Sequence, residues 1–202
     1  MADAGNILVV IPARGGSKRL PRKNVLPLAG KPLICWTIEA ALEARLNAKI
    51  VVTSDDREIL GLAQQYESQG IIAHKRPDHL ASDTAATASA LTDVVEAQEG
   101  AGFTPHTIIL LQPTSPLRNA SDIVASLDLF HSTGCHDTVV SVCEVDHPTA
   151  WVGTMASNSV FANTKLSEMR SQEYAKEHRL NGAIYISRAD VLKILALCSR
   201  AS

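Results

Sequence analysis

The residues best suited to chemistry lie near the N-terminus, in a loop that directly follows a short apolar run. The run covers residues 7–11, and residues 12–24 read Pro-Ala-Arg-Gly-Gly-Ser-Lys-Arg-Leu-Pro-Arg-Lys-Asn. Two adjacent glycines let the main chain approach a ligand and turn its N–H groups toward it. Five cations fall within ten residues: Arg14, Lys18, Arg19, Arg22 and Lys23. A buried strand that leads into such a loop predicts a phosphate-binding site.

Two better-known phosphate-binding motifs are absent from this loop. The Walker motif ends in Gly-Lys-Ser/Thr, whereas the order here is Gly15-Gly16-Ser17-Lys18. The dinucleotide fingerprint Gly-x-Gly-x-x-Gly does not occur. A solvated basic loop is therefore the alternative interpretation of these residues taken by themselves.

The complete string resembles a known family. Residues 11–24 are similar to the signature of the acylneuraminate cytidylyltransferases, also called CMP-sialic acid synthetases. Residues 110–118, Leu-Leu-Gln-Pro-Thr-Ser-Pro-Leu-Arg, and residues 181–185, Asn-Gly-Ala-Ile-Tyr, resemble further motifs of that family at similar spacing. The resemblance extends from Ile7 to about Leu195. It implies an enzyme that transfers CMP from CTP to a nine-carbon α-keto acid sugar, N-acetylneuraminate or a close relative, and releases pyrophosphate.

The resemblance also implies roles for individual residues on the nucleotide side. The implied catalytic residues are cations that hold the triphosphate and its developing charge: Arg14, Lys18, Lys23 and Arg170. The implied CTP-binding residues are Arg14, Gly15, Gly16, Ser17, Lys18, Asn24, Arg76 and Thr87. Arg76 lies in a long polar loop, and such loops beside a site concentrate binding residues.

The acceptor side is predicted from two stretches. Gln112 follows the apolar run 107–111, and open parallel sheets bind ligands at the carboxyl ends of their strands. Taken alone, Asn181-Gly182 predicts a turn and nothing more. The resemblance implies that Asn181 and Tyr185 lie near the acidic sugar, with Arg179 beside them to pair with its carboxylate.

Magnesium is the cofactor that the resemblance implies. The family carries an Asp-x-Asp element after the Asn-Gly-Ala-Ile-Tyr motif, and its carboxylates hold the ion. Only 17 residues follow Tyr185 here, and Asp190 is the one acid among them. We therefore expect the C-terminal family segment to be missing, the metal ligands to be unknown and transfer to be impaired. Magnesium needs only one or two carboxylates when substrate phosphates also bind it.

The order of apolar runs and helical repeats predicts the fold. Strands are predicted at about 7–11, 49–53, 71–73, 107–111 and 138–142, with helices between them. This alternation predicts βαβ units and a parallel sheet. The resemblance implies a three-layer, doubly wound α/β fold of the nucleotide-diphospho-sugar transferase type, as a single domain over 1–202. The alternation stops between about 144 and 178, where the resemblance implies a dimerisation arm.

Composition limits the possible partners and location. A chain of 202 residues with 46% hydrophobic content and a net charge of −2 is typical of one globular domain, and this charge does not favour nucleic acid as a partner. No apolar run approaches the roughly 20 residues of a membrane span. The four cysteines show no metal-binding spacing and are expected to be free thiols. With no signal-peptide pattern at its start, the chain is expected to be cytoplasmic. The resemblance implies a homodimer.

Several alternatives remain at this level. Within the enzyme class, legionaminate or pseudaminate could replace neuraminate as the acceptor sugar. A catalytically impaired homologue that still binds nucleotide would account for the absent carboxylates. A phosphate-loop hydrolase is disfavoured by the residue order of the loop.

Overall fold

The computed structural model describes residues 5–16, 20–77, 80, 87–155, 157, 161–162, 170 and 173–191. The chain divides into two compact units. The core unit comprises Met1–Ser141 and Gly182–Ser202, and the second unit comprises Val142–Asn181. The segment in which an arm is predicted, 144–178, lies within the second unit.

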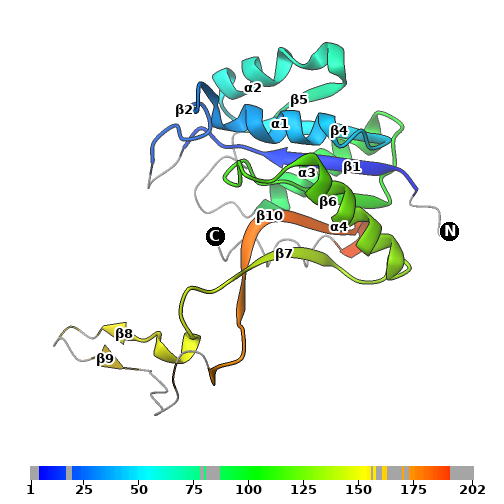
Figure 1. Cartoon of the computed structure of the whole chain (residues 1–202). Coiled ribbons are helices and arrows are strands. Elements are labelled where there is room, and N and C mark those ends of the chain that lie inside the picture. The colour runs from blue at the N-terminus through cyan, green and yellow to red at the C-terminus, as the bar shows by residue number, and fades with distance from the viewer. Residues whose placement is uncertain are drawn as a thin grey trace. The chain divides into compact units, whose positions relative to one another are not determined.

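A six-stranded sheet organises the chain (Figure 1), in the order β5, β4, β1, β6, β10, β7. The strands are β5 (Ile71–Lys75), β4 (Ala48–Ser54), β1 (Ile7–Pro12), β6 (Thr107–Leu110), β10 (His178–Arg188) and β7 (Val139–Glu144). β1 pairs in parallel with both β4 and β6, and β4 pairs in parallel with β5. β10 runs antiparallel to β6. The predicted mostly parallel sheet is thus confirmed.

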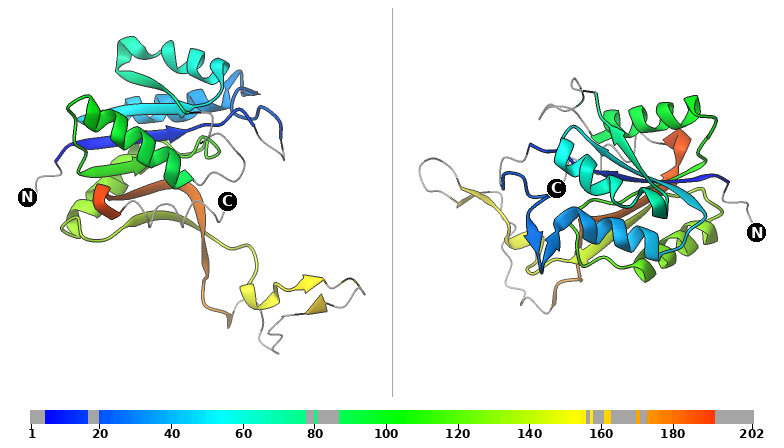
Figure 2. Two further views of the ribbon diagram at one scale, coloured as in Figure 1. Left: turned by 180° about the vertical axis from the view of Figure 1, so that it is seen from behind. Right: turned by 90° about the horizontal axis from the view of Figure 1, so that it is seen from above.

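Helices cover both faces of this sheet. They are α1 (Leu33–Glu43), α2 (Arg57–Gln64), α3 (Thr87–Gly100) and α4 (Ala120–Ser132). Successive side chains of a strand point to opposite faces. Val9 and Ile11 accordingly pack with α1, α2 and α4, whereas Leu8 and Val10 pack with α3. The right-hand view of Figure 2 shows α3 on one side of the sheet and α1 with α4 on the other. The three layers are those predicted.

The helices begin where the sequence supplies caps. Asp56 accepts hydrogen bonds from the main-chain N–H groups of Glu58 and Ile59 at the start of α2. Asn119 and Asp122 form a capping box at the start of α4. The cap predicted for α3, at Asp83 or Thr84, lies outside the described residues.

Short elements complete the description. In the core unit, β2 (Pro27–Leu28) and β3 (Lys31–Pro32) form a small hairpin, and single 3₁₀ turns occur at Glu67–Gln69 and Ala189–Val191. In the second unit, a 3₁₀ turn at Thr149–Trp151 precedes the paired strands β8 (Thr154–Met155) and β9 (Phe161–Ala162). None of the described helices is long and apolar enough to cross a membrane.

One local prediction is wrong. The dipeptide Asn181-Gly182 predicts a turn, but both residues lie inside the eleven-residue strand β10. Gly182 has φ of +78°, a left-handed conformation that glycine adopts without a steric penalty. The same glycine that signals a turn therefore allows an irregularity within the strand instead.

Candidate active site

The carboxyl ends of four parallel strands meet at one edge of the sheet. The chain runs from β1 to β4 and β5 on one side, and then returns to β6 on the other side of β1. Such a reversal of strand order is the place where open α/β sheets bind ligands. The loop after β1, the turn after β4, the start of the loop after β5 and the loop after β6 all begin here.

The loop after β1 is anchored by hydrogen bonds at its described ends. The Ala13 N–H donates to the Thr53 carbonyl over 3.0 Å, which extends the pairing of β1 with β4. Asn24 is buried, and its Nδ2 donates to the Arg14 carbonyl over 3.0 Å, so that the loop closes on itself. Ser17 and Lys18, both predicted to bind CTP, lie outside the described residues, as does Arg19.

Two acidic residues after β4 contact Gly15 of this loop. Asp55 Oδ1 accepts a hydrogen bond of 3.1 Å from the Gly15 N–H. Asp56 packs so closely that a Cβ added to Gly15 would lie 2.6 Å from Asp56 Oδ2, whereas one added to Gly16 would meet no atom of the described residues within 4 Å. Position 15 therefore requires glycine for reasons of space. The sequence prediction missed both roles, because they depend on β4 lying beside β1.

The loop carries less unbalanced positive charge than its sequence predicts. Arg22 Nη1 lies 3.4 Å from Asp56 Oδ2, and Arg22 Nη2 pairs with Glu58. Of the predicted catalytic cations, Arg14 and Lys23 are half-buried in the described part of the loop. Arg22 thus serves to tie the loop to the start of α2.

Arg76 joins this site from the end of β5. Its side chain is buried, and Nη2 donates to the Thr53 carbonyl over 3.2 Å. Burial lowers the pKa of Arg76, the nearby carboxylates of Asp55 and Asp93 oppose this, and the Arg14 charge lowers the pKa further. Arg14 and Arg76 are therefore close enough to repel each other, and a bound anion would relieve that repulsion. The structure brings together the two arginines that were predicted to bind CTP.

The residues predicted to bind the acceptor sugar lie in different environments. Gln112 follows β6, and a Cβ added to Gly182 would lie 2.5 Å from Gln112 Oε1, so this side chain lies against β10. Tyr185 is only 1% exposed and packs in the core cluster beside α3. Its burial favours a packing role, and the predicted sugar contact is untested. Asn181 belongs to the second unit, where its Nδ2 donates to the Val142 carbonyl over 3.2 Å.

The remaining predicted residues lie elsewhere. Arg170 and Arg179 are exposed residues of the second unit. The main chain of Arg170 forms hydrogen bonds with Glu173, from its N–H to Oε2 over 3.1 Å and from the Glu173 N–H to its carbonyl over 2.9 Å. Thr87 is the first residue of α3. Their predicted roles toward the substrates stay predictions.

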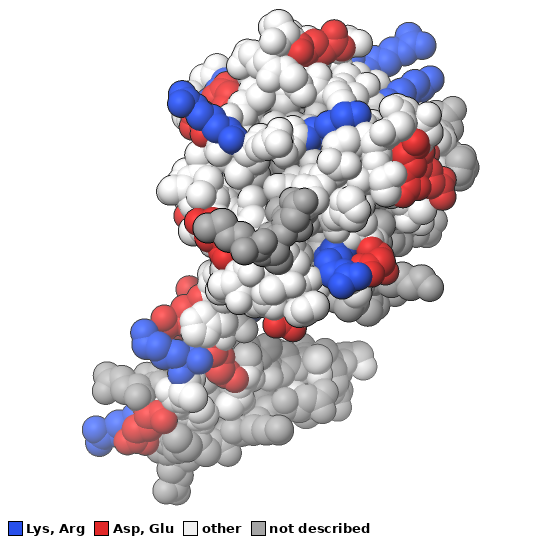
Figure 3. Space-filling model, turned by 90° about the vertical axis from the view of Figure 1, so that its right-hand side faces the viewer, with Lys and Arg blue, Asp and Glu red and all other residues white. Residues whose placement is uncertain are grey.

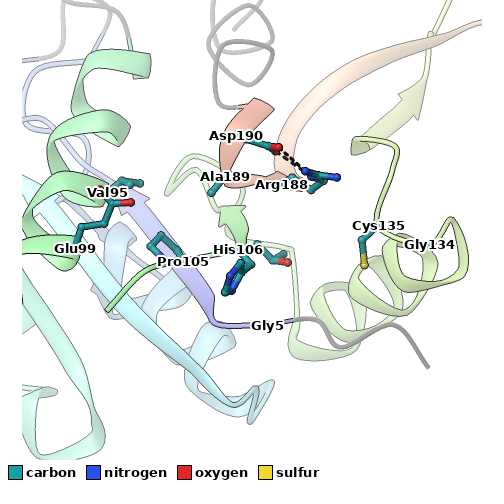
Figure 4. Close-up of a pocket in the computed structure, with 11 residues that line it drawn as sticks. Gly5, Val95, Glu99, Pro105, His106, Gly134, Cys135, Arg188, Ala189 and Asp190 are labelled. Carbon is teal, nitrogen blue, oxygen red and sulfur yellow. Dashed lines mark hydrogen bonds and ion pairs between the residues drawn. The ribbon is translucent and has the colours of Figure 1, made fainter. Parts of the chain in front are cut away.

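A cavity of about 590 Å³ lies at the opposite end of the sheet (Figure 4). Gly5, His106 and Thr107 line it where β1 and β6 begin, together with the Arg188–Asp190 ion pair at the end of β10. It contains none of the predicted site residues. On the face shown in Figure 3, the described Lys and Arg side chains alternate with Asp and Glu rather than forming a field of one sign. The charged residues that line the cavity are Glu99, Arg188 and Asp190, so it offers no concentration of positive charge suited to a triphosphate.

The described residues offer no preformed metal centre. Among them, no group of three or more His, Cys, Asp or Glu side chains could hold an ion. The residues after Val191, where the resemblance expects metal ligands, lie outside the description. We accordingly assign no step of a reaction to a protein-held metal.

The fold defines a class of protein: an α/β protein with a mostly parallel sheet, a class in which ligands bind at the switch point of the strand order. A family described as Cytidylyltransferase matches residues 8–197. Because this match covers nearly the whole chain, the chain belongs to the cytidylyltransferase family and is a nucleotidyltransferase.

Curated relatives agree with this assignment. The chain is 37% identical to a CMP-N,N'-diacetyllegionaminic acid synthase of Legionella pneumophila, over 91% of this chain and 78% of that protein. It is 32% identical to an N-acylneuraminate cytidylyltransferase of Escherichia coli, over 90% of this chain but only 42% of that longer protein. It is 31% identical to a pseudaminic acid cytidylyltransferase of Campylobacter jejuni, over 88% of this chain and 76% of that protein.

A solved structure shows the same fold. The structure of CMP:2-keto-3-deoxy-manno-octonic acid synthetase complexed with CTP superposes with a TM-score of 0.70 at 23% identity. The match covers 96% of this chain and 78% of that one. At this identity the likeness concerns the fold.

Proposed function

We propose that this chain transfers CMP from CTP to a nine-carbon α-keto acid sugar, with N-acetylneuraminate, N,N'-diacetyllegionaminate and pseudaminate as the candidate acceptors. The names of the three relatives support this class of acceptor, and their similar identities of 37%, 32% and 31% do not separate its members. The family supports CTP as the nucleotide.

One observation of the structure carries the nucleotide part of the proposal. Asn24 and Arg76 are buried at the carboxyl edge of the sheet, and each has a polar atom, Oδ1 and Nε respectively, with no hydrogen-bond partner among the described residues. Buried polar atoms are normally satisfied, and unmet ones at one edge are typical of a site that a ligand or its ordered waters complete. Arg14 and Arg76 add positive charge at the same edge, which favours an anionic ligand such as a nucleotide.

In the proposed reaction, the protein side chains take little part in making or breaking covalent bonds. A sugar hydroxyl attacks the α-phosphorus of CTP and releases its proton to solvent; the new P–O bond forms, the P–O bond to the β-phosphate breaks, and pyrophosphate leaves with the electron pair of that bond. Such transfers depend on positioning and on stabilising charge. Arg14 and Lys23 would hold the triphosphate with the loop amides, Arg76 and Asn24 the nucleoside end, and Gln112 the acceptor. A magnesium ion that arrives with CTP would supply additional charge neutralisation.

The second unit supports a homodimer as part of the proposal. It exposes the apolar side chains of Trp151, Val152, Met155 and Phe161, the last two on the small strands β8 and β9. Clustered exposed apolar residues are typical of protein–protein contacts. A second copy of this chain is the proposed partner.

The test is pyrophosphate release from CTP with each of the three sugars, at saturating magnesium and without it. The proposal predicts release that depends on both CTP and a sugar, together with a CMP-sugar product identified by mass. CTP binding without release would leave a nucleotide-binding homologue that lacks the transfer activity. Release of phosphate or pyrophosphate without sugar would indicate a hydrolase and contradict the proposal.

A further inference from the structure

Arg118 is a buried arginine between the loop after β6 and α4, and it contacts three separate parts of the core unit. It is 6% exposed. Its Nη1 donates to the carbonyls of Gln112, over 3.2 Å, and Ala183, over 2.9 Å. Its Nη2 donates to Thr37 Oγ1 on α1 over 2.6 Å.

The position is costly for a charged side chain. All three acceptors are neutral, and among the described residues Arg118 forms no ion pair. Burial lowers the pKa of Arg118 to about 10, with the Asp122 carboxylate opposing the change, so the guanidinium remains charged at neutral pH. A buried charge with no ion-pair partner is costly, and Arg118 Nε also has no hydrogen-bond partner among the described residues. What Arg118 offers in return is its three hydrogen bonds to separate parts of the core unit.

The Arg118 guanidinium lies where the pairing of β6 with β10 ends. The β6–β10 ladder ends at Leu110 opposite Tyr185. Continued in the same register, Leu111 would lie opposite Ile184 and Gln112 opposite Ala183, and the carbonyls of Gln112 and Ala183 share Arg118 Nη1. The guanidinium thus bridges the two chains where their direct pairing stops. Beside this bridge, the Gln112 carboxamide lies over Gly182, where a Cβ would come within 2.5 Å of Oε1.

We propose that Arg118 is a positioning residue for the acceptor sugar: it bridges Gln112 and Ala183 at the end of the β6–β10 ladder and thereby fixes the Gln112 carboxamide in its binding orientation. The inference rests on the proposed transfer reaction and names the residue that sets its acceptor geometry. Arg118 acts through Gln112 and touches neither substrate. Its hydrogen bonds go to Gln112, Ala183 and Thr37, none of which is a predicted nucleotide residue after β1 or β5.

Two substitutions, one more severe than the other, test the positioning role of Arg118. Arg118→Lys keeps a positive charge but loses the planar fork that reaches both carbonyls and Thr37. Thr37→Val keeps the shape of the side chain and removes the Nη2 acceptor alone. We expect Arg118→Lys to raise the KM for the sugar by about tenfold to a hundredfold, as a misplaced positioning group does, with the KM for CTP nearly unchanged. Thr37→Val should shift the same constant in the same direction by less.

A double-mutant cycle with Gln112→Ala separates positioning from general structural damage. If Arg118 acts through Gln112, Arg118→Lys has little further effect on the sugar KM once the carboxamide is gone. Additive effects in the cycle, or equal changes in the KM values for CTP and sugar, would overturn the inference while leaving the proposed reaction intact. An absence of sugar-dependent turnover in the unmodified chain would instead contradict the proposed function. Should Arg118→Lys fail to fold, the same cycle with Thr37→Val decides the question.

Discussion

The two ends of the central sheet differ in the kind of opening they present. At the amino end of β1 and β6 lies a cavity of about 590 Å³, lined by main chain, His106 and an exposed Arg188–Asp190 pair. At the carboxyl end, the buried side chains of Asn24 and Arg76 donate hydrogen bonds to main-chain carbonyls, and the Gly15 N–H donates to the Asp55 carboxylate. The volume of an opening therefore does not identify the ligand site in this protein. The polar and charged side chains whose burial costs free energy lie at the carboxyl end instead. Each prediction below alters one end and measures CTP binding or stability.

The largest effect is expected from Gly15→Ala. A Cβ at this position would lie 2.6 Å from Asp56 Oδ2 and 2.8 Å from Asp56 Cβ, and Asp56 is held by α2 and by Arg22. Overpacking of this kind costs about 1–3 kcal/mol, so the loop must shift and CTP affinity should fall by about tenfold or more. Isothermal titration calorimetry with CTP gives the dissociation constant.

Gly16→Ala is the matched control for this change. It adds the same methyl group one residue later, where no described atom lies within 4 Å, and it keeps the main-chain N–H. Its CTP affinity should fall by less than that of Gly15→Ala, because the loop need not shift away from Asp56 to admit the methyl group. Equal losses in the two variants would contradict the close packing of Asp56 on the loop.

A smaller effect is expected from Asp56→Ala, and it concerns stability. The change removes the N-cap of α2, whose loss costs about 1 kcal/mol, together with the pairing to Arg22. Thermal unfolding should then shift down by about 2–4 °C for a chain of this size. Glu58→Ala is the control because it loses only the exposed pairing to Arg22. Similar shifts for both variants would show that the cap contributes little.

The sequence predicts those features of the carboxyl end that depend on residues close together in the chain, but not those that depend on contacts between distant residues. The apolar runs and the contiguous loop correctly predict β1, β4, β5 and β6 and place Arg14, Arg76 and Gln112 at one edge. The hydrogen bond of Asp55 to Gly15, and the bridge of Arg118 to Ala183, join residues 40 and 65 positions apart. They depend on the order of strands in the sheet, which local patterns do not encode. Asn181-Gly182 fails as a turn because the neighbouring strand pairing overrides its local preference.

Asp55→Asn should strengthen CTP binding by a few-fold, whereas Gly15→Ala weakens it. Asparagine keeps an oxygen that accepts from the Gly15 N–H, but it removes a negative charge close to Arg76. CTP is a polyanion, so its KM should fall by about twofold to fivefold at low salt and by less at high salt. The KM is measured by pyrophosphate release at two ionic strengths. A rise in KM would indicate that the Asp55 carboxylate itself helps to hold the substrate.

The smallest effect is expected at the other end of the sheet. Asp190→Asn weakens the exposed pair with Arg188 beside the cavity and touches none of the residues at the carboxyl edge. The KM for CTP should remain within about twofold of that of the unmodified chain. A large change in this KM would mean that the cavity takes part in nucleotide binding.

The central claim is that CTP binds at the carboxyl edge of the sheet, and amide chemical shifts in ¹⁵N-labelled protein test it most directly. Titration with CTP should move the signals of Gly15, Gly16, Asn24 and Arg76 and leave those of Gly5, His106 and Ala189 in place. The first group borders the loops after β1 and β5, and the second lines the cavity. Shifts confined to the cavity residues would contradict the account and move the nucleotide to the opposite end.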